Sequence, residues 1–315
     1  MQSDLSLVVH ARRFLTSEIC EFELRGDIGQ DLPPFSAGAH IKVTTPSGAV
    51  RSYSLTNDEA ERDRYIIAVK REDRGRGGSL SMHEEADVGQ LMSVTAPAND
   101  ISVAPSKRYL LIAGGIGITP MISIVRKLVR EERDNFKLVY LTRSQADTAY
   151  LGELTALCPP ESLTIHHAGM TPSSQYDLWQ HLARPTDTDI YYCGPQPLME
   201  AIRLRTIHWP RSRLHFEDFA GVSGVDVDSH PFTVRQHSTG RVFEIPADKT
   251  ILEVLRSEGL QPKSSCESGT CGTCRVRLVA GEPDHRDLVL GEDERLEAFV
   301  PCVSRAVQGE LELDF

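Results

Sequence analysis

Short runs that alternate apolar and polar residues dominate the first hundred positions. They recur in SLVVHARRF, ICEFELRG, HIKVTTP, SYSLT, RYIIAVKRE and LMSVTAP, and the period of two is typical of strands with one buried face. Turn residues such as Pro33-Pro34 and Pro46-Ser47-Gly48 separate these runs. Many short strands at this spacing predict a small all-β barrel over residues 1–103, with one helix that begins near Ser79.

The pattern changes near residue 104. YLLIA is a continuous apolar run, as a strand buried on both faces requires, and further strands are predicted at FKLVYLT, LTIHHAG and DIYYCGP. After Thr119 the apolar residues recur at helical spacing, so Thr119 is predicted to cap a helix and Pro120 to take its first position. Strands alternating with helices predict an α/β nucleotide-binding domain with a parallel sheet over residues 104–224.

A third pattern follows a predicted linker at 221–226. PFTVRQH and RVFEIP flank the turn Ser238-Thr239-Gly240, which predicts a hairpin. Thr250 and Glu253 form a capping-box pair that opens the helix ILEVLRSE, and Gly259 ends it. These signals predict a further, smaller domain at the C-terminal end of the chain.

Composition excludes several classes of protein. Apolar residues make up 40% of the chain and charged residues 25%, which is enough apolar material for several packed cores. The formal net charge of −11 disfavours nucleic acid and anionic membrane surfaces as partners. The longest apolar stretch, residues 109–125, contains three glycines and a proline, and the N-terminal residues lack the pattern of a secretory signal. We therefore expect a cytoplasmic protein.

The cysteines carry the strongest chemical signal. Cys266, Cys271 and Cys274 follow the spacing C-x4-C-x2-C, and Cys302 comes after 27 intervening residues. This is the plant-type spacing of four thiolates that hold a [2Fe–2S] cluster. A structural zinc site with four cysteines is the alternative, although such sites usually pair two C-x2-C knuckles.

Two further segments have the composition of nucleotide-binding turns. AGGIGITP, with Gly114, Gly115 and Gly117, lies between a predicted strand and a helix, where backbone amides and the helix N-terminus can approach a pyrophosphate. CGPQPLM, which begins at Cys193, stands at the end of another predicted strand. Both would lie at the carboxyl edge of a parallel sheet, where ligands bind. Each glycine could instead serve tight packing alone.

The barrel contains a candidate anion site. Arg51, in RSYS, can pair with a phosphate, and Gly78-Ser79 begins the predicted helix, whose N-terminus attracts anions. Tyr53 can pack on a flat ring. Taken alone, RSYS is compatible with any strand and GGS with any turn.

Eight segments spread along the chain share the pattern of one known family: RSYSLTND, IIAVKRE, GRGGSLSMHE, AGGIGITPM, YLTRS, YCGPQPLM, HFEDF and SSCESGTCGTC. On these segments the chain resembles the phthalate dioxygenase reductase family, which includes vanillate demethylase reductases. The resemblance implies a multidomain protein with three parts in a fixed order. These are an FMN-binding barrel of ferredoxin-reductase type at 1–103, an α/β NAD-binding domain at 104–224, and a plant-type [2Fe–2S] ferredoxin domain of α+β β-grasp fold at 225–315.

The resemblance also implies which residues bind the cofactors, and it favours FMN over FAD. The FMN phosphate is expected at Arg51, Gly77, Gly78 and Ser79, and the flavin ring at Ser52, Tyr53, Ser54, Val69 and Lys70. The dinucleotide is expected at Gly114, Gly115, Gly117, Thr119, Pro120, Cys193, Gly194 and Pro195. The cluster ligands are Cys266, Cys271, Cys274 and Cys302.

Two residues are expected at the reacting face of the flavin. Ser54 lies in the motif that lines the ring, and Phe219 matches an aromatic residue that shields the flavin where nicotinamide must enter. From the residues alone, Phe219 is more simply a core aromatic.

The choice between NADH and NADPH rests on the residues after FKLVYLT, which are Thr142, Arg143 and Ser144. Arg143 could accept a ribose 2′-phosphate, or could equally stack on adenine or pair with the pyrophosphate. The resemblance favours NADH.

The resulting prediction is an NADH-dependent reductase that passes electrons through FMN and a [2Fe–2S] cluster to a terminal Rieske-type oxygenase. Residues 225–315 contain 17 acidic and 10 basic residues, an excess that suits docking to a basic partner. A diaphorase or flavin reductase that is not coupled to an oxygenase is the alternative enzyme, and a zinc-stabilised binding module is the alternative outside enzymes. Three tethered domains need no oligomer, so a monomer suffices.

Overall fold

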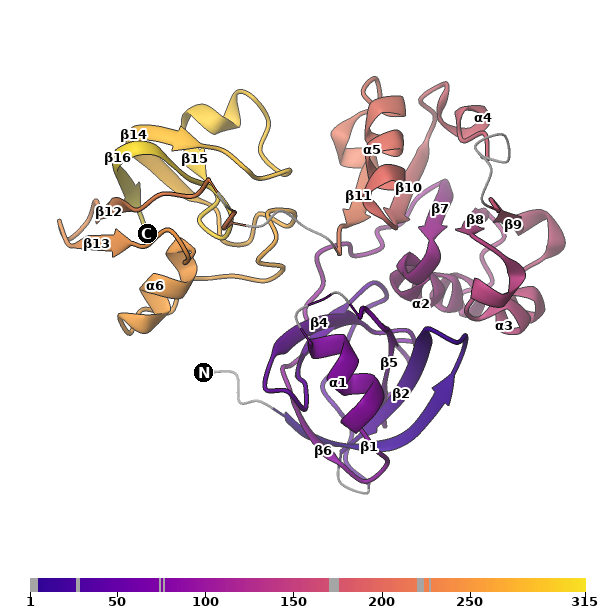
Figure 1. Cartoon of the computed structure of the whole chain (residues 1–315). Coiled ribbons are helices and arrows are strands. Elements are labelled where there is room, and N and C mark those ends of the chain that lie inside the picture. Colours follow the sequence, from indigo (N-terminus) through magenta and orange to yellow (C-terminus); the bar gives the residue numbers. More distant parts are fainter. Residues whose placement is uncertain are drawn as a thin grey trace. The chain divides into compact units, whose positions relative to one another are not determined.

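The structure is a computed structural model of the chain and describes residues 5–26, 29–73, 75, 77–169, 176–219, 224–226 and 228–315. These residues form two compact units, Met1–Glu217 and Asp218–Phe315. The first unit contains two sheets and the second contains one (Figure 1). Of the linker predicted at 221–226, residues 221–223 lie outside the described part.

The first sheet is antiparallel, with the strand order β4-β3-β6-β1-β2-β5. Its strands are β1 (Leu5–Phe14), β2 (Ile19–Arg25), β3 (His40–Thr44), β4 (Val50–Ser54), β5 (Tyr65–Lys70) and β6 (Leu91–Val94). A bridge between Leu55 and Ile67 joins the two ends of the order, so the sheet curls into the predicted barrel around a core that includes Phe22, Ile41 and Ile67. The helix expected near Ser79 is α1 (Gly78–Glu85).

The second sheet is parallel, with the strand order β11-β10-β7-β8-β9. Its strands are β7 (Arg108–Gly114), β8 (Phe136–Thr142), β9 (Leu163–His167), β10 (Thr188–Cys193) and β11 (Leu214–Glu217). The helices between them are α2 (Ile118–Arg130), α3 (Leu151–Leu157), α4 (Trp179–Leu182) and α5 (Gln196–Arg205). The predicted α/β architecture is therefore confirmed, with both glycine-containing turns at the carboxyl edge of the sheet.

The start of α2 differs from the sequence prediction. The helix begins at Ile118 and its N-cap is Gly117, so Thr119 lies inside the first turn instead of capping it. The reason is the 3₁₀ turn η1 (Gly115–Gly117), which leads directly into the helix. The Thr119 hydroxyl donates to the Ile116 carbonyl at 3.1 Å, and Pro120 occupies a first-turn position where its missing N–H costs nothing.

Polar contacts connect the barrel to α2 within the first unit. Lys127 of α2 pairs with Glu59 at 2.6 Å, and Arg130 pairs with Glu59 at 2.9 Å and with Asp58. The Ser123 hydroxyl donates to the Asn57 carbonyl at 3.1 Å. The segment that follows β4 is therefore fixed to the helix that follows the glycine turn, which holds the two candidate cofactor sites in one frame.

The third sheet forms the second unit, with the order β13-β12-β16-β14-β15. Its elements are β12 (Phe232–Gln236), β13 (Val242–Ile245), α6 (Ile251–Ser257), β14 (Val276–Asp284), β15 (Ala298–Phe299) and β16 (Arg305–Asp314). The predicted hairpin and helix are confirmed, and the capping box is present with both Thr250 and Glu253 bonds formed. Gly259 follows the helix at φ 81°. No helix in the described ranges is both long and apolar enough to cross a bilayer.

Candidate functional site

The four clustered cysteines lie together in the second unit as two pairs. The Cys271 thiol donates to Cys266, which lowers the pKa of Cys266, and the Cys302 thiol donates to Cys274, which lowers the pKa of Cys274. Cys274 and Cys302 are buried, whereas Cys266 and Cys271 are partly exposed. Cys302 comes from the turn before β16, so the fold brings the distant fourth cysteine to the loop of the other three.

The loop around Cys266 and Cys271 is built to surround a charged sulfur group. The amides of Ser268 and Cys271 both donate to Cys266 Sγ at 3.4 Å, and the Thr273 amide donates to Cys271 Sγ at 3.4 Å. Gly269 and Gly272 have φ values of 76° and 72°, which only glycine adopts without strain. Amide donors of this kind stabilise negative charge on thiolates.

The donor set fits a two-iron cluster. Four thiols in two pairs provide the four thiolates that a [2Fe–2S] cluster requires, two for each iron. In the part of the chain that the structure describes, no three His, Cys, Asp or Glu side chains converge on a point where one ion could bind. The zinc alternative usually pairs two C-x2-C knuckles, whereas this loop contains one C-x2-C knuckle and one C-x4-C arm.

A salt bridge that sequence reasoning did not identify supports the cysteine loop. Arg256 of α6 pairs with Glu267 at 2.7 Å and donates to Ser264 Oγ at 2.6 Å. Glu267 directly follows Cys266 and has a φ of 54°, an unusual conformation for a residue with a side chain. The capping box pointed to α6, but nothing in the sequence linked that helix to the loop.

The residues of the candidate anion site lie close together in the barrel. A Cβ added to Gly78 would lie 3.0 Å from Cγ and Nε of Arg51, so the Arg51 side chain lies against the first turn of α1. Gly77 is the N-cap residue of α1 and has a φ of 79°. No side chain caps the first amides of the helix. Ser79 Oγ accepts a hydrogen bond from the Glu72 amide at 3.1 Å. A guanidinium beside uncapped helix amides is a suitable cradle for a phosphate.

The RSYS segment also contains a buried polar atom that has no hydrogen-bond partner among the described residues. Tyr53 Oη is buried with no hydrogen-bond partner in the described residues, and burial raises the pKa of Tyr53 to about 12. An orphaned buried hydroxyl next to Arg51 fits a site that awaits a polar ligand. Ser52 is exposed, and the Ser54 hydroxyl donates to Glu217 Oε2 at 3.0 Å, across the two sheets of the first unit.

The two residues expected on the next strand differ from each other. Val69 is 1% exposed and its side chain belongs to the barrel core, so only its backbone is available to a ligand. Its carbonyl already bonds to the His83 ring at 2.8 Å. The Lys70 ammonium pairs with Glu72 at 2.6 Å. Periodicity alone could not separate these two orientations, because Tyr65–Lys70 is nearly all apolar.

The two glycine-containing turns of the parallel sheet are packed directly against each other. A Cβ on Gly117 would lie 2.2 Å from the Cys193 carbonyl oxygen, and a Cβ on Gly114 would lie 2.7 Å from Cδ of Pro195. A Cβ on Gly194 would lie 3.1 Å from the Gly114 backbone. This close approach is compatible with both interpretations of these glycines. They can serve the packing of the two turns alone, or they can also let a dinucleotide approach the backbone at the carboxyl edge.

The residues after β8 have separate environments. Thr142 is buried and its hydroxyl bonds to Thr148 Oγ1 at 2.8 Å and His167 Nδ1 at 2.9 Å. Arg143 is exposed at the carboxyl edge. Thr142 therefore fixes the turn, while Arg143 is the residue of the pair that is available to a ligand.

Phe219 lies in the second unit, two residues after β11. Its side chain is 43% exposed, so it is not a residue of a hydrophobic core. The flavin-contacting residues expected from the sequence lie in the first unit.

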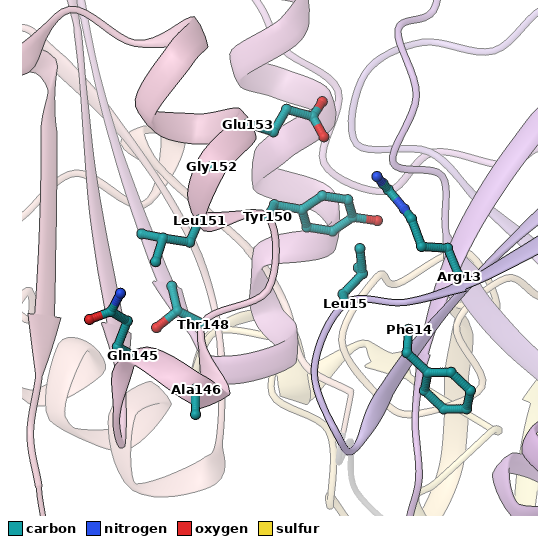
Figure 2. A pocket seen from close by; sticks show the side chains of 10 residues that line it. All are labelled: Arg13, Phe14, Leu15, Gln145, Ala146, Thr148, Tyr150, Leu151, Gly152 and Glu153. Atoms are coloured by element: carbon teal, nitrogen blue, oxygen red, sulfur yellow. The ribbon is translucent and has the colours of Figure 1, made fainter.

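A pocket of about 770 Å³ lies elsewhere in the first unit. Figure 2 shows Tyr150 directed toward Leu15 and Arg13, with Gln145 and Thr148 on the opposite wall. None of the residues predicted from the sequence to bind a cofactor lines it. We assign this pocket no function.

Comparison with known protein families identifies two domains. Residues 234–307 match a 2Fe-2S iron-sulfur cluster binding domain, and this range contains all four clustered cysteines. Residues 111–204 match an oxidoreductase NAD-binding domain, which contains both glycine turns.

Similar proteins extend over nearly the full chain. Phthalate dioxygenase reductase of Burkholderia cepacia is 44% identical over 98% of this chain and 97% of its own length. A vanillate O-demethylase oxidoreductase of a Pseudomonas species is 36% identical over 98% of this chain and 99% of its own. A solved structure of phthalate dioxygenase reductase superimposes with a TM-score of 0.77 at 44% identity and covers 99% of this chain and 98% of that one.

Proposed function

This chain belongs to the phthalate dioxygenase reductase family, and on that premise we propose that it is the reductase component of an aromatic-ring oxygenase or O-demethylase system. NADH supplies two electrons as a hydride, FMN takes both and releases them singly, and the [2Fe–2S] cluster carries one at a time. One observation carries the proposal. The same chain contains an NAD-binding domain and, after it in the sequence, a 2Fe-2S domain whose four thiols lie in two pairs.

The proposed division of labour follows the three sheets. Residues 1–103 hold FMN, residues 104–224 hold NADH, and residues 225–315 hold the cluster through Cys266, Cys271, Cys274 and Cys302. We place this activity in the cytoplasm, where thiols stay reduced until iron binds.

In the barrel, Arg51 and the N-terminus of α1 hold the FMN phosphate, as their contact supports. Tyr53 places its ring against the flavin, and its unsatisfied hydroxyl finds a partner when the flavin binds. Ser54 lies at the reacting face and Phe219 shields that face before NADH binds. The exposure of Phe219 suits a side chain that must move.

In the parallel sheet, Gly114, Gly117 and Gly194 bring backbone amides close to the pyrophosphate of NADH, since none of them has room for a side chain. Arg143 contacts the adenosine end of the dinucleotide. NADH is the proposed donor, in line with the family.

The electron acceptor is proposed to be a terminal Rieske-type oxygenase that docks on the acidic face of the second unit. Burial and ion pairing decide which acidic residues of this unit can contact such a partner. Asp287 is buried, with its carboxylate bonded to the Leu290 amide at 2.8 Å. Glu294 is paired with Arg275 at 2.6 Å. Glu292, Asp293 and Glu297 are exposed, as is the apolar side chain of Leu296 near them in the sequence, which is 77% exposed.

We expect charge reversal of this face to slow electron delivery. The triple variant Glu292→Lys, Asp293→Lys and Glu297→Lys should lower kcat/KM for the oxygenase by about tenfold at low salt and by less at high salt, because exposed charges steer association and are screened. Glu244→Lys, on the edge strand at the other end of the sheet, is the control. Equal effects of the triple and control variants would place docking elsewhere.

The FMN site is tested by Arg51→Ala. Loss of a charge-assisted contact to phosphate should weaken FMN binding by about ten- to a hundred-fold. Arg13→Ala, which removes an exposed arginine of the same barrel, should leave FMN affinity unchanged. Flavin fluorescence titration of the deflavinated proteins measures both. Unchanged affinity in the Arg51 variant would move the phosphate elsewhere, and tighter binding of FAD than FMN would overturn the flavin assignment.

The proposed function itself is tested by reconstitution. The purified protein with NADH and a terminal oxygenase of the phthalate or vanillate type should form hydroxylated or demethylated product in proportion to the NADH consumed. Rapid NADH oxidation with no reduction of any oxygenase would instead make the chain an uncoupled diaphorase.

A further inference from the structure

Arg305, the first residue of β16, is a fully buried arginine. Its side chain is 1% exposed, and its two terminal nitrogens donate to four backbone carbonyls. Nη1 reaches Lys249 at 2.9 Å and Gly224 at 3.3 Å, and Nη2 reaches His230 at 2.9 Å and Pro246 at 3.0 Å. The guanidinium therefore ties three separate segments of the second unit together.

This burial is costly, which indicates that the position has a specific use. Among the described residues no carboxylate is within ion-pair distance of Arg305, and burial lowers the pKa of its guanidinium. The charge is compensated by carbonyl dipoles and by the ring of Phe232, whose centroid lies 4.9 Å away. Only the planar fork of arginine can reach four carbonyls at once, so lysine cannot replace it.

A second arginine binds the stretch that leads into β12, which we call the entering segment. Arg286 pairs with Asp226 at 2.9 Å and also donates to Ser229 Oγ at 3.3 Å. It is oriented by Asp284 at 2.6 Å. Two arginines therefore hold the stretch before β12 in the second unit, through Gly224, Asp226, Ser229 and His230.

Gly224 places this entering segment against a cluster ligand. A Cβ at this position would lie 2.8 Å from the Cys302 carbonyl oxygen, 2.8 Å from Thr250 Cγ2 and 3.1 Å from Val303 Cα. Cys302 lies in the turn before β16, three residues before Arg305. The chain thus passes in direct contact with the backbone of the fourth cysteine, and any side chain at Gly224 would push that backbone away.

We propose that Gly224 and Arg305 are positioning residues for the cluster, which hold the entering segment as a seat for the Cys302 turn. The inference rests on the proposed role of Cys302 as a ligand and extends it to residues outside the cysteine motif. The seat fixes the distance between Cys302 and its partner Cys274, on which the stability and the electronic symmetry of the cluster depend.

The first test is Gly224→Ala in the full chain. The added methyl should displace the Cys302 turn, so an iron chelator should remove the cluster about ten- to a hundred-fold faster, with altered g values of the reduced cluster. Flavin content and NADH–ferricyanide activity should stay normal. The matched control is Gly152→Ala, because Gly152 also has no positive φ and its Cβ would meet nothing within 4 Å.

The second test is Arg305→Lys, which keeps the charge but loses the fork, with Arg277→Lys on the neighbouring exposed strand as control. Arg305→Lys should accelerate loss of the cluster, as Gly224→Ala does. If Gly224→Ala does not accumulate as folded protein, Arg305→Lys decides between the outcomes. A fall in melting temperature with wild-type g values and a wild-type rate of cluster loss would reduce the seat to ordinary packing and overturn the inference.

These outcomes are separable from failure of the proposed function. If Cys302→Ser keeps a normal cluster, the ligand assignment fails. If Cys302→Ser loses the cluster while Gly224→Ala and Arg305→Lys both keep it unchanged, the ligand assignment holds and only the seat is wrong.

Discussion

Cys302→Ser should abolish the [2Fe–2S] absorption and the reduction of cytochrome c, while bound FMN and NADH–ferricyanide activity persist. Cys302 is the one cysteine of the four outside the C-x4-C-x2-C loop, and it is the hydrogen-bond partner of Cys274. A hydroxyl is a poor ligand for iron in place of a thiolate, so one iron would lose half of its protein ligands. The retained activities depend only on steps that precede the cluster.

Cys158→Ser is the matched control for that variant. Cys158 is buried in the first unit with no cysteine partner, and burial raises its thiol pKa to about 11. Its replacement should leave the cluster spectrum unchanged. A normal spectrum in Cys302→Ser, measured by absorption and by iron content, would remove Cys302 from the ligand set.

Gly117→Ala should reduce hydride transfer from NADH by about a hundredfold, since misplacement of about 1 Å at a reacting centre has effects of this size. The added Cβ would lie 2.2 Å from the Cys193 carbonyl oxygen and 2.7 Å from the Gly194 amide, and all of these are backbone atoms that cannot rotate away. The two turns at the carboxyl edge must therefore separate. The cluster and the FMN content should be unaffected, because both lie on other sheets.

Stopped-flow absorption under anaerobic conditions measures that step directly, as the bleaching of the flavin after mixing with NADH. Gly152→Ala again serves as the control, because its methyl has open space. Wild-type bleaching in Gly117→Ala would show that the close approach of the two turns serves packing only, as the alternative interpretation of these glycines holds.

The elements that the sequence predicted well are those with local signals. The capping box at Thr250 and Glu253, the hairpin at 238–240 and the buried strand β7 each depend on a few neighbouring residues. The cysteine spacing belongs to the same class, because three of the four ligands lie within nine positions. The predicted start of α2 was wrong because Gly115–Gly117 forms a 3₁₀ turn, and the pattern of apolar residues gives no sign of this turn.

The features that could not be predicted depend on contacts between distant segments. Strands β14 and β16 each contain a run of four exposed residues, which interrupts the alternation, and they form through pairing with each other. The bond between Ser54 and Glu217, the salt bridge of Arg256 and the four carbonyls around Arg305 likewise join residues far apart in the chain. A single sequence contains Arg305 as one charged residue among many, and only the fold shows that it is buried.

The measurement that tests the account most directly is freeze-quench electron paramagnetic resonance of the wild-type protein after anaerobic mixing with NADH. The account predicts that flavin absorption bleaches first and that the signal of a reduced [2Fe–2S] cluster then grows, and that Cys302→Ser bleaches without ever producing that signal. If the wild-type flavin bleaches but no cluster signal follows, although dithionite produces one, electrons from NADH do not reach the cluster and the chain is not the proposed reductase.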